Sequence, residues 1–324
     1  MEYRKVGRHG IKISEFSLGA WVTYGGQVGE DVALECMQAA YEHGVNFFDN
    51  ADIYAMGQAE VVMGNVIRKL GLNRTDLVIS SKVFWPFGDG PNDRGLSRKH
   101  IMEAVHGSLK RLGTDYLDFY FCHRYDPEVE VEEVVRAMDD LVHQGKVLYW
   151  GTSEWRGHQI ADAVGVARQW GLYPPAIEQP HYNMFTRHIV ETELMDAAHN
   201  HGVGLVVWSP LASGVLTGKY NSGIPQGSRL ADPDYDWLRG VITAERVAKV
   251  RQLTEVANEL GCSMAQLALV WLLRKPEITS VITGASRAEQ VHENMKALEF
   301  KDKLTPDVLA RIEEILANDP NAES

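Results

Sequence analysis

The feature that most constrains the fold of this chain is a regular alternation of short β-rich runs and helical patterns. The first run is "FSLGA" at residues 16–20 and the last is "TSVITG" at 279–284, with six more between them. Each run is followed by a segment with apolar residues at helical spacing. Strict alternation predicts parallel strands, because each helix carries the chain back to the end where the next strand begins. Eight such units predict an α/β fold of the (β/α)8, or TIM-barrel, class.

Further segments add to this alternation. The opening "YRKVGRHGIKIS", residues 3–14, predicts a β-hairpin outside the barrel, and helical patterns at 243–260 and 263–274 predict additional C-terminal helices. No linker rich in proline or serine divides the chain, so we expect one domain spanning residues 1–324. A doubly wound sheet is the alternative fold; the absence of GxGxxG after an early strand weighs against it.

Composition narrows the function classes. The formal net charge of −12, from 32 basic and 44 acidic residues, disfavours nucleic acid as a partner, since such binding usually needs a basic face. The chain lacks an apolar run of about 18 residues and the apolar region of a secretory signal, so we do not expect a membrane protein. Three scattered cysteines, Cys36, Cys122 and Cys262, fit neither a disulfide framework nor a CxxC metal site, which indicates a cytoplasmic setting.

Polar residues stand at the carboxyl ends of successive predicted strands. The second strand ends at Asp49 in "NFFD", the third at Lys82 in "ISSK" and the fourth at His123 in "FYFCH". In a barrel these ends converge on the face where active sites lie. A carboxylate at the rim of a core is costly unless it is paired, so we expect Lys82 to be the cation for Asp49.

Tyr54 follows Asp49 by five residues and completes a catalytic set. The Lys82 ammonium is expected to lower the pKa of Tyr54 from about 10 toward neutrality, which suits a general acid. His123 is expected to donate a hydrogen bond to the same substrate oxygen. Because the set holds no metal site and no activated nucleophile, it predicts carbonyl chemistry with a hydride cofactor. Each of these residues also has a structural explanation when it is taken alone: Asp49 and Lys82 could form an ion pair at the rim of the barrel, and Tyr54 could be a packed aromatic residue. Their occurrence together at successive strand ends favours catalysis.

Several longer stretches resemble one family. They are "FFDNADIYAMGQAEVVMG", "ISSKVFW", "YLDFYFCHR", "YWGTSEW", "EQPHYNMF", "WSPLASGVLTGKY" and "VITGASRAEQVHEN". Over residues 3–317 the chain resembles the aldo-keto reductase superfamily, and within it the branch of the voltage-gated potassium channel β subunits. The resemblance implies a (β/α)8 barrel, NADPH-dependent carbonyl reduction, and a tetrad of Asp49, Tyr54, Lys82 and His123.

The resemblance also implies the residues that contact NADPH or NADP+. They follow the barrel strands and are Trp21, Asp49, Ser153, Gln179, Trp208, Ser209, Pro210, Leu211, Ser213, Gly214, Lys219, Arg229, Gly284, Ser286, Gln290, Glu293 and Asn294. Arg229 has a charge suited to a 2′-phosphate, and Ser286 stands at the start of the last barrel helix, where backbone N–H groups favour phosphate. The predicted substrate contacts are Trp21, Tyr54, Trp85, His123 and Trp155.

Two departures from the family pattern matter. His123 stands where the animal channel subunits carry asparagine, which favours a competent reductase over a sensor. Glu154 stands where many members carry asparagine or arginine, so we leave it out of the predicted nicotinamide site.

Three function classes remain open. The leading hypothesis is the reduction of aldehydes or ketones, with a small carbonyl compound as substrate. The alternative is a redox-sensing regulatory protein similar to a potassium channel β subunit, and the resemblance implies a homo-oligomer such as a tetramer. A metal-dependent barrel hydrolase would need a histidine cluster at the first strand end, and "FSLGAW" has none; His199 and His201 lie near a helix end instead.

Overall fold

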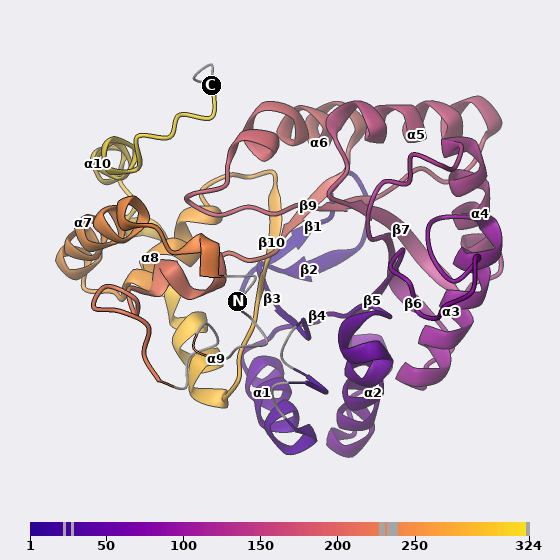
Figure 1. The fold of residues 1–324 in the computed structure, drawn as a ribbon, viewed down its shortest axis with the longest axis horizontal. Coiled ribbons are helices and arrows are strands. Elements are labelled where there is room, and N and C mark those ends of the chain that lie inside the picture. Colours follow the sequence, from indigo (N-terminus) through magenta and orange to yellow (C-terminus); the bar gives the residue numbers. More distant parts are fainter. Residues whose placement is uncertain (22–23, 27–28, 227–230, 232–238, 322–324) are drawn as a thin grey trace.

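Eight parallel strands close into a barrel in the computed structural model, which describes residues 1–21, 24–26, 29–226, 231 and 239–321 (Figure 1). Each strand pairs with its neighbours in chain order, and the last strand closes the barrel on the first. The predicted TIM barrel is therefore confirmed. The barrel strands are β3 (Phe16–Gly19), β4 (Phe47–Asp49), β5 (Val78–Val83), β6 (Leu117–Cys122), β7 (Val147–Ser153), β8 (Ile177–Gln179), β9 (Gly204–Val207) and β10 (Ile278–Thr283).

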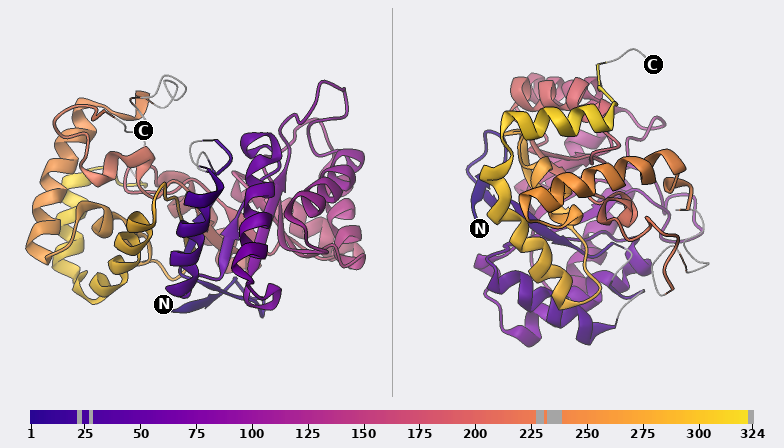
Figure 2. Two further views of the ribbon diagram at one scale, coloured as in Figure 1. Left: turned by 90° about the horizontal axis from the view of Figure 1, so that it is seen from below. Right: turned by 90° about the vertical axis from the view of Figure 1, so that its left-hand side faces the viewer.

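Helices surround the barrel, and the C-terminal ones gather at one side of it (Figures 1 and 2). The surrounding helices are α1 (Glu30–Glu42), α2 (Gln58–Leu70), α3 (Arg98–Leu112), α4 (Val131–His143), α5 (Gly157–Trp170), α6 (Met195–His201) and α9 (Ala288–Met295). Those at the side are α7 (Ala244–Leu260), α8 (Met264–Leu272) and α10 (Pro306–Leu316). A π-helical turn, Val190–Leu194, leads into α6. The additional C-terminal helices are as predicted.

The N-terminal hairpin closes the end of the barrel where the strands begin. It consists of β1 (Tyr3–Lys5) and β2 (Lys12–Ser14), paired antiparallel. Val6 and Ile13 are fully buried and belong to the same apolar cluster as Phe47 and Phe119 of the barrel interior. The barrel is thus a packed core that is sealed at this end, and the opposite end, at the strand carboxyl termini, is left for a site.

Local signals in the sequence account for several helix ends. The Ser97 hydroxyl accepts a hydrogen bond from the backbone N–H of His100, which caps the start of α3. The same helix ends at Gly113, which adopts a left-handed φ of 68° that a residue without a Cβ takes without strain.

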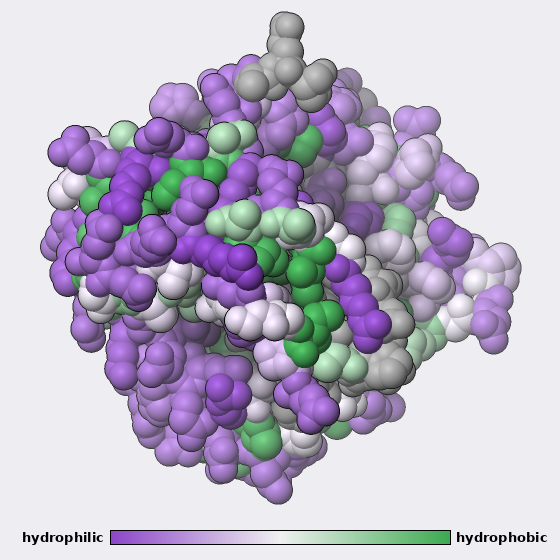
Figure 3. Space-filling model, turned by 60° about the vertical axis from the view of Figure 1, so that its left-hand side comes forward, coloured by the Kyte–Doolittle hydropathy of each residue, from purple (hydrophilic) through white to green (hydrophobic). Residues whose placement is uncertain are grey.

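The surface on the side of the C-terminal helices is largely hydrophilic, with apolar residues gathered in a short strip near its centre (Figure 3). Within the described residues, every helix is too short or too polar to cross a bilayer.

The packing of α2 on α3 generates a stability prediction. A Cβ at Gly64 of α2 would lie 2.3 Å from the backbone oxygen of Leu112 at the end of α3, whereas a Cβ at Gly165 of α5 would meet no atom within 4 Å. Gly64→Ala should lower the free energy of unfolding by about 1–3 kcal/mol, because the clash outweighs the gain in helix propensity.

The matched variant Gly165→Ala should raise the free energy of unfolding by up to about 1 kcal/mol, since only the helix propensity changes. Urea unfolding followed by circular dichroism measures both variants. Equal shifts for the two would mean that the close approach of α2 to α3 is not tight in solution.

Candidate active site

A cavity of about 1390 Å³ opens at the carboxyl ends of the barrel strands. Its lining includes Tyr54 and His123 near β4 and β6, and Gln290 and Asn294 on α9. It therefore extends from the predicted tetrad to the last barrel helix, far enough to hold an extended ligand.

The Lys82 ammonium is the centre of the tetrad. The side chain is fully buried, and its Nζ donates to Asp49 Oδ2 at 2.7 Å, to the backbone oxygen of Asn50 at 2.7 Å and to the Tyr54 hydroxyl at 3.1 Å. Burial lowers the pKa of Lys82, and the adjacent Asp49 carboxylate opposes that shift. The structure forms the Asp49–Lys82 pair that the sequence predicted and adds a third contact that ties Tyr54 to it.

Asp49 is itself held by two neutral donors. Its Oδ1 accepts hydrogen bonds from the Ser80 hydroxyl at 2.7 Å and from Gln179 Nε2 at 3.0 Å. Gln179 comes from β8, so this contact spans the barrel interior. The carboxylate is thus held by side chains of two other strands, β5 and β8, before any ligand arrives.

Tyr54 is placed by a tight turn after β4. Ala55 and Met56 have left-handed φ values of 47° and 51°, and the turn leads into α2. Burial raises the pKa of Tyr54 well above its usual value, and the charge of Asp49 adds to the rise. The prediction of a lowered pKa is therefore wrong, because desolvation of the buried phenolate outweighs the lowering effect of the positive charge of Arg124. A phenol that keeps its proton remains a donor.

His123 faces the Tyr54 ring. The two ring centroids are 5.9 Å apart in an edge-to-face arrangement. Burial lowers the pKa of His123 well below its usual value, and the positive charge of Lys82 adds to this effect. The imidazole is therefore neutral at physiological pH and can donate one N–H to a ligand oxygen.

Another buried carboxyl group, that of Asp52, lies near the tetrad, and the sequence reasoning missed it. Asp52 is 1% exposed, and its Oδ1 accepts a hydrogen bond of 2.6 Å from the backbone N–H of Ile53. Its neighbour Glu60 accepts bonds of 2.6 Å from Ser81 and from Arg111. Burial raises the pKa of Asp52 to about 8, and the charge of Glu60 adds to the rise. The run "DNAD", with two acids three residues apart, was the available signal.

Most residues predicted to hold the cofactor line the cavity. These are Trp21, Asp49, Ser153, Gln179, Trp208, Ser209, Pro210, Leu211, Ser213, Gly214, Lys219, Gly284, Ser286, Gln290, Glu293 and Asn294, and Trp85 lines it too. Arg229 lies outside the described residues. Trp155 lies elsewhere than predicted: it is 1% exposed, packs edge to face against Tyr125 at 5.0 Å, and is not part of the lining. Its indole fills the apolar core behind β7, where burial of its large surface is most favourable.

Two backbone features suit a ligand with phosphate groups. After β9, the residues Ser209, Ala212, Ser213 and Gly214 all have positive φ, between 47° and 91°. Successive backbone N–H groups in such a segment can point toward one anion. At the other side of the cavity, Ser286 precedes the N-terminus of α9, where N–H groups and the helix dipole favour negative charge. With the buried amide of Gln179 and the Trp208 ring, these donors fit a dinucleotide.

Glu154, which the sequence reasoning left out, holds Trp208 in place. Its backbone is left-handed, with φ of 59°. Its Oε1 accepts hydrogen bonds from Trp208 Nε1 at 2.9 Å and from the backbone N–H of His181 at 2.5 Å. The His181 ring stacks on the Trp208 indole with centroids 4.3 Å apart. One edge and one face of the Trp208 indole are therefore fixed. The three residues follow β7, β8 and β9, so the sequence alone did not indicate that they meet.

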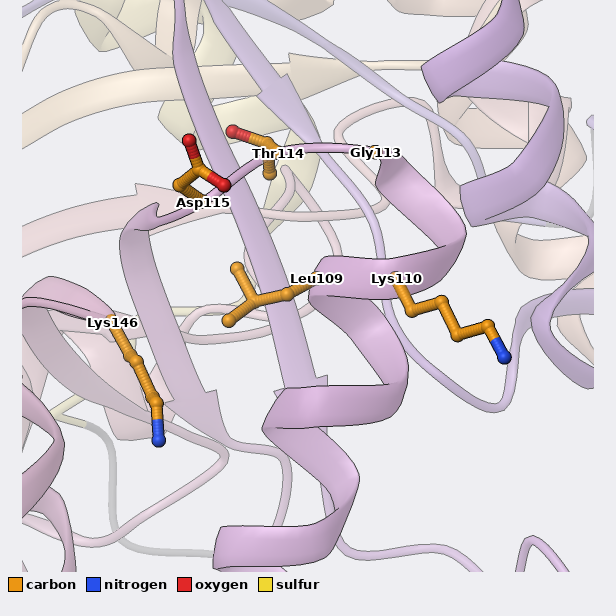
Figure 4. A pocket seen from close by; sticks show the side chains of 6 residues that line it. All are labelled: Leu109, Lys110, Gly113, Thr114, Asp115 and Lys146. Carbon is orange, nitrogen blue, oxygen red and sulfur yellow. The ribbon is translucent and has the colours of Figure 1, made fainter.

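A second hollow lies on the opposite face, where α3 and α4 lead into β6 and β7 (Figure 4). Its lining includes Asp115 and Lys146, and the Lys146 ammonium already contacts His106 and Gln144 at 2.7 Å. This hollow carries no convergent set of buried polar groups, so the cavity above the tetrad is the candidate active site.

The comparisons with known proteins agree with this geometry. The family model described as "Aldo/keto reductase family" matches residues 15–317. The chain belongs to the aldo/keto reductase family. It is 51% identical over 322 residues to a protein of Arabidopsis thaliana named "Probable voltage-gated potassium channel subunit beta", covering 99% of this chain and 98% of that one. A protein of Oryza sativa subsp. japonica with the same name is 49% identical over the same shares of both chains.

The buried Asp52 leads to a pH prediction. Its folded pKa lies above the unfolded value near 4, so the folded state holds the extra proton between about pH 4 and pH 8. The stability that goes with this proton is fully present below pH 4 and is lost as the pH rises through 8. In the parent protein, this proton should make the free energy of unfolding fall by up to about 1.4 kcal/mol per pH unit over this window. Asp52→Asn should remove that contribution, so the free energy of unfolding of the variant should depend less steeply on pH.

Urea unfolding at a series of pH values from 5 to 8 measures the effect. Asp302→Asn, at an exposed position, is the matched control and should leave the slope unchanged. Parallel stability curves for the Asp52 variant and the parent protein would show that this carboxyl does not titrate between the two states.

Proposed function

We propose that this chain is an NADPH-dependent reductase that converts aldehydes or ketones to alcohols. The observation that carries the proposal is the buried Lys82 ammonium, which contacts both the Asp49 carboxylate and the Tyr54 hydroxyl at the edge of the cavity. Family membership supports oxidoreductase chemistry of this kind. In this proposal residues 1–324 form one functional domain.

The chain's own residues would perform the acid half of the reaction. When bound, NADPH supplies the hydride to the carbonyl carbon. Tyr54, whose raised pKa keeps its proton in place, donates that proton to the carbonyl oxygen. Lys82 stabilises the developing phenolate by hydrogen bonding and charge, and the neutral His123 donates a hydrogen bond that orients the oxygen.

The cavity lining supports a nicotinamide cofactor. Ser153 and Gln179 are the residues that would hold the carboxamide, and Trp208 would stack on the ring. The left-handed segment that contains Ser213 and Gly214 would hold the pyrophosphate. The choice of NADPH over NADH rests on Arg229 and on the helix start after Ser286, both of which suit a 2′-phosphate.

A regulatory role is the second candidate, and the names of the plant relatives favour it. Those proteins are named as potassium channel β subunits, so this chain would bind a channel as a homo-oligomer and report the redox state of its cofactor. Both roles are compatible with the same cavity. Co-purification with a channel, together with negligible turnover of carbonyl compounds, would favour the regulatory role.

Replacing the proposed proton donor tests the reductase. Tyr54→Phe should lower turnover of aldehydes by about 10²- to 10⁴-fold, because it removes the general acid. NADPH binding should stay nearly unchanged, because the phenol hydroxyl contributes to proton transfer and not to cofactor affinity. Stopped-flow absorbance of NADPH oxidation and a fluorescence titration with NADPH and NADH give the two readouts. Retained turnover in this variant would exclude Tyr54 as the acid.

The Glu154 anchor gives a second, binding-only test. Glu154→Leu removes the acceptor that holds Trp208 Nε1 and the His181 backbone, whereas Glu154→Gln retains an acceptor oxygen. The dissociation constant of NADPH should rise about 10-fold or more in the leucine variant, since charge-assisted bonds of this kind are worth about 1.5–3 kcal/mol. The glutamine variant should lose less. Equal affinities in the two variants would contradict an anchoring role.

A further inference from the structure

The tetrad end of the cavity carries a cation that the proposed proton transfer does not use. Arg124 directly follows His123 at the end of β6 and lines the cavity. Its guanidinium carbon lies 5.4 Å from the centroid of the Trp85 ring, and its Nη1 donates a hydrogen bond of 2.5 Å to the backbone oxygen of His123. These two contacts position the group and leave further N–H donors for a ligand.

Among the residues that the structure describes, Arg124 forms an ion pair with no carboxylate. Other partly buried arginines, such as Arg74, Arg111 and Arg274, each form an ion pair with a carboxylate. Over the residues that the structure describes, Arg124 forms only the two contacts given above. A partly buried guanidinium without a carboxylate partner leaves its charge available to an anion. The missing counterion therefore points to an anionic ligand.

The charge of Arg124 acts at the reacting end of the cavity. After burial and Lys82, it is the next cause of the low pKa of His123. It also opposes the burial that raises the pKa of Tyr54. An anion bound by Arg124 would thus lie within electrostatic reach of the tetrad, on the substrate and not at the distant α9 end of the cavity.

We propose that Arg124 binds a carboxylate of the substrate, so that the substrates are aldehydes or ketones that carry a carboxylate group. The planar guanidinium matches a planar carboxylate through two parallel N–H donors. Trp85, which is 37% exposed, offers an apolar face to the carbon frame between the carboxylate and the carbonyl group. This inference rests on the proposed reductase function.

Two aldehydes of similar shape test the proposal. 4-Carboxybenzaldehyde carries the carboxylate, and 4-methylbenzaldehyde carries a neutral group at the same position. With the full chain and NADPH, kcat/KM should be higher for the carboxylate compound. Arg124→Met should lower kcat/KM for that compound about 10- to 100-fold more than for the methyl compound, because it removes a charge-assisted pair. Arg124→Lys should retain part of the preference.

Arg94→Met is the matched control, because Arg94 is exposed on the loop after β5 and does not line the cavity. It should leave the ratio of the two kcat/KM values unchanged. An equal loss for both aldehydes in Arg124→Met would overturn the proposal and make Arg124 a residue that acts only on the tetrad. A comparable loss of NADPH affinity would overturn it in favour of a cofactor contact.

A binding measurement separates this inference from the proposed reaction. If neither aldehyde is reduced, the reductase proposal fails for these substrates. The carboxylate proposal is then tested by comparing the binding of 4-methylbenzoate with that of 4-methylbenzamide. Quenching of tryptophan fluorescence should show tighter binding of the benzoate by the parent protein and loss of that preference in Arg124→Met. No preference in the parent protein would overturn the carboxylate assignment without reference to turnover.

Discussion

The candidate site depends on one buried cation. Lys82 has no access to water, so burying its ammonium would be costly without hydrogen-bond acceptors. The Asp49 carboxylate, a backbone oxygen and the Tyr54 hydroxyl each accept a hydrogen bond from it. Removing any one of these partners would leave a buried charge partly unpaired. The interaction also joins β4, β5 and the turn after β4, so that the same contact that makes the lysine tolerable places the phenol. The packed barrel interior and the hairpin that seals it supply the rigid frame for this geometry.

Burial decides the protonation states more than neighbouring charge does. Desolvation is the first cause of the raised pKa of Tyr54 and of the lowered pKa of His123. Both shifts favour neutral forms that can donate a proton or a hydrogen bond. The cavity therefore favours a phenol that keeps its proton, and this differs from the partly ionised phenol that the sequence suggested. The Lys82 side chain contacts the Tyr54 hydroxyl and Arg124 lines the cavity next to His123, so both lie near the position where negative charge would develop in the proposed reaction.

The hydrophobic periodicity predicted the architecture well because it reflects local secondary structure. The residues at the strand ends were informative because a barrel brings all these ends to one face. The polar residue at each strand end identified Asp49, Lys82 and His123, since parallel neighbouring strands must bring their carboxyl ends together. The roles of Glu154 and Arg124 were not predictable in this way. Glu154 contacts Trp208, and Arg124 contacts Trp85, on loops that are distant in sequence, and loop conformation depends on tertiary contacts.

The sequence by itself determined the class of fold, the hairpin, the additional C-terminal helices and the pairing of Asp49 with Lys82, because these follow from hydrophobic period and from the cost of an unpaired buried charge. Only the tertiary structure decided how deeply each group is buried, and with it the direction in which the pKa of Tyr54 moves. It also decided that Trp155 packs in the core while Trp85 faces the cavity. Solvent exposure is a property of the assembled chain, and no local pattern of residues specifies it.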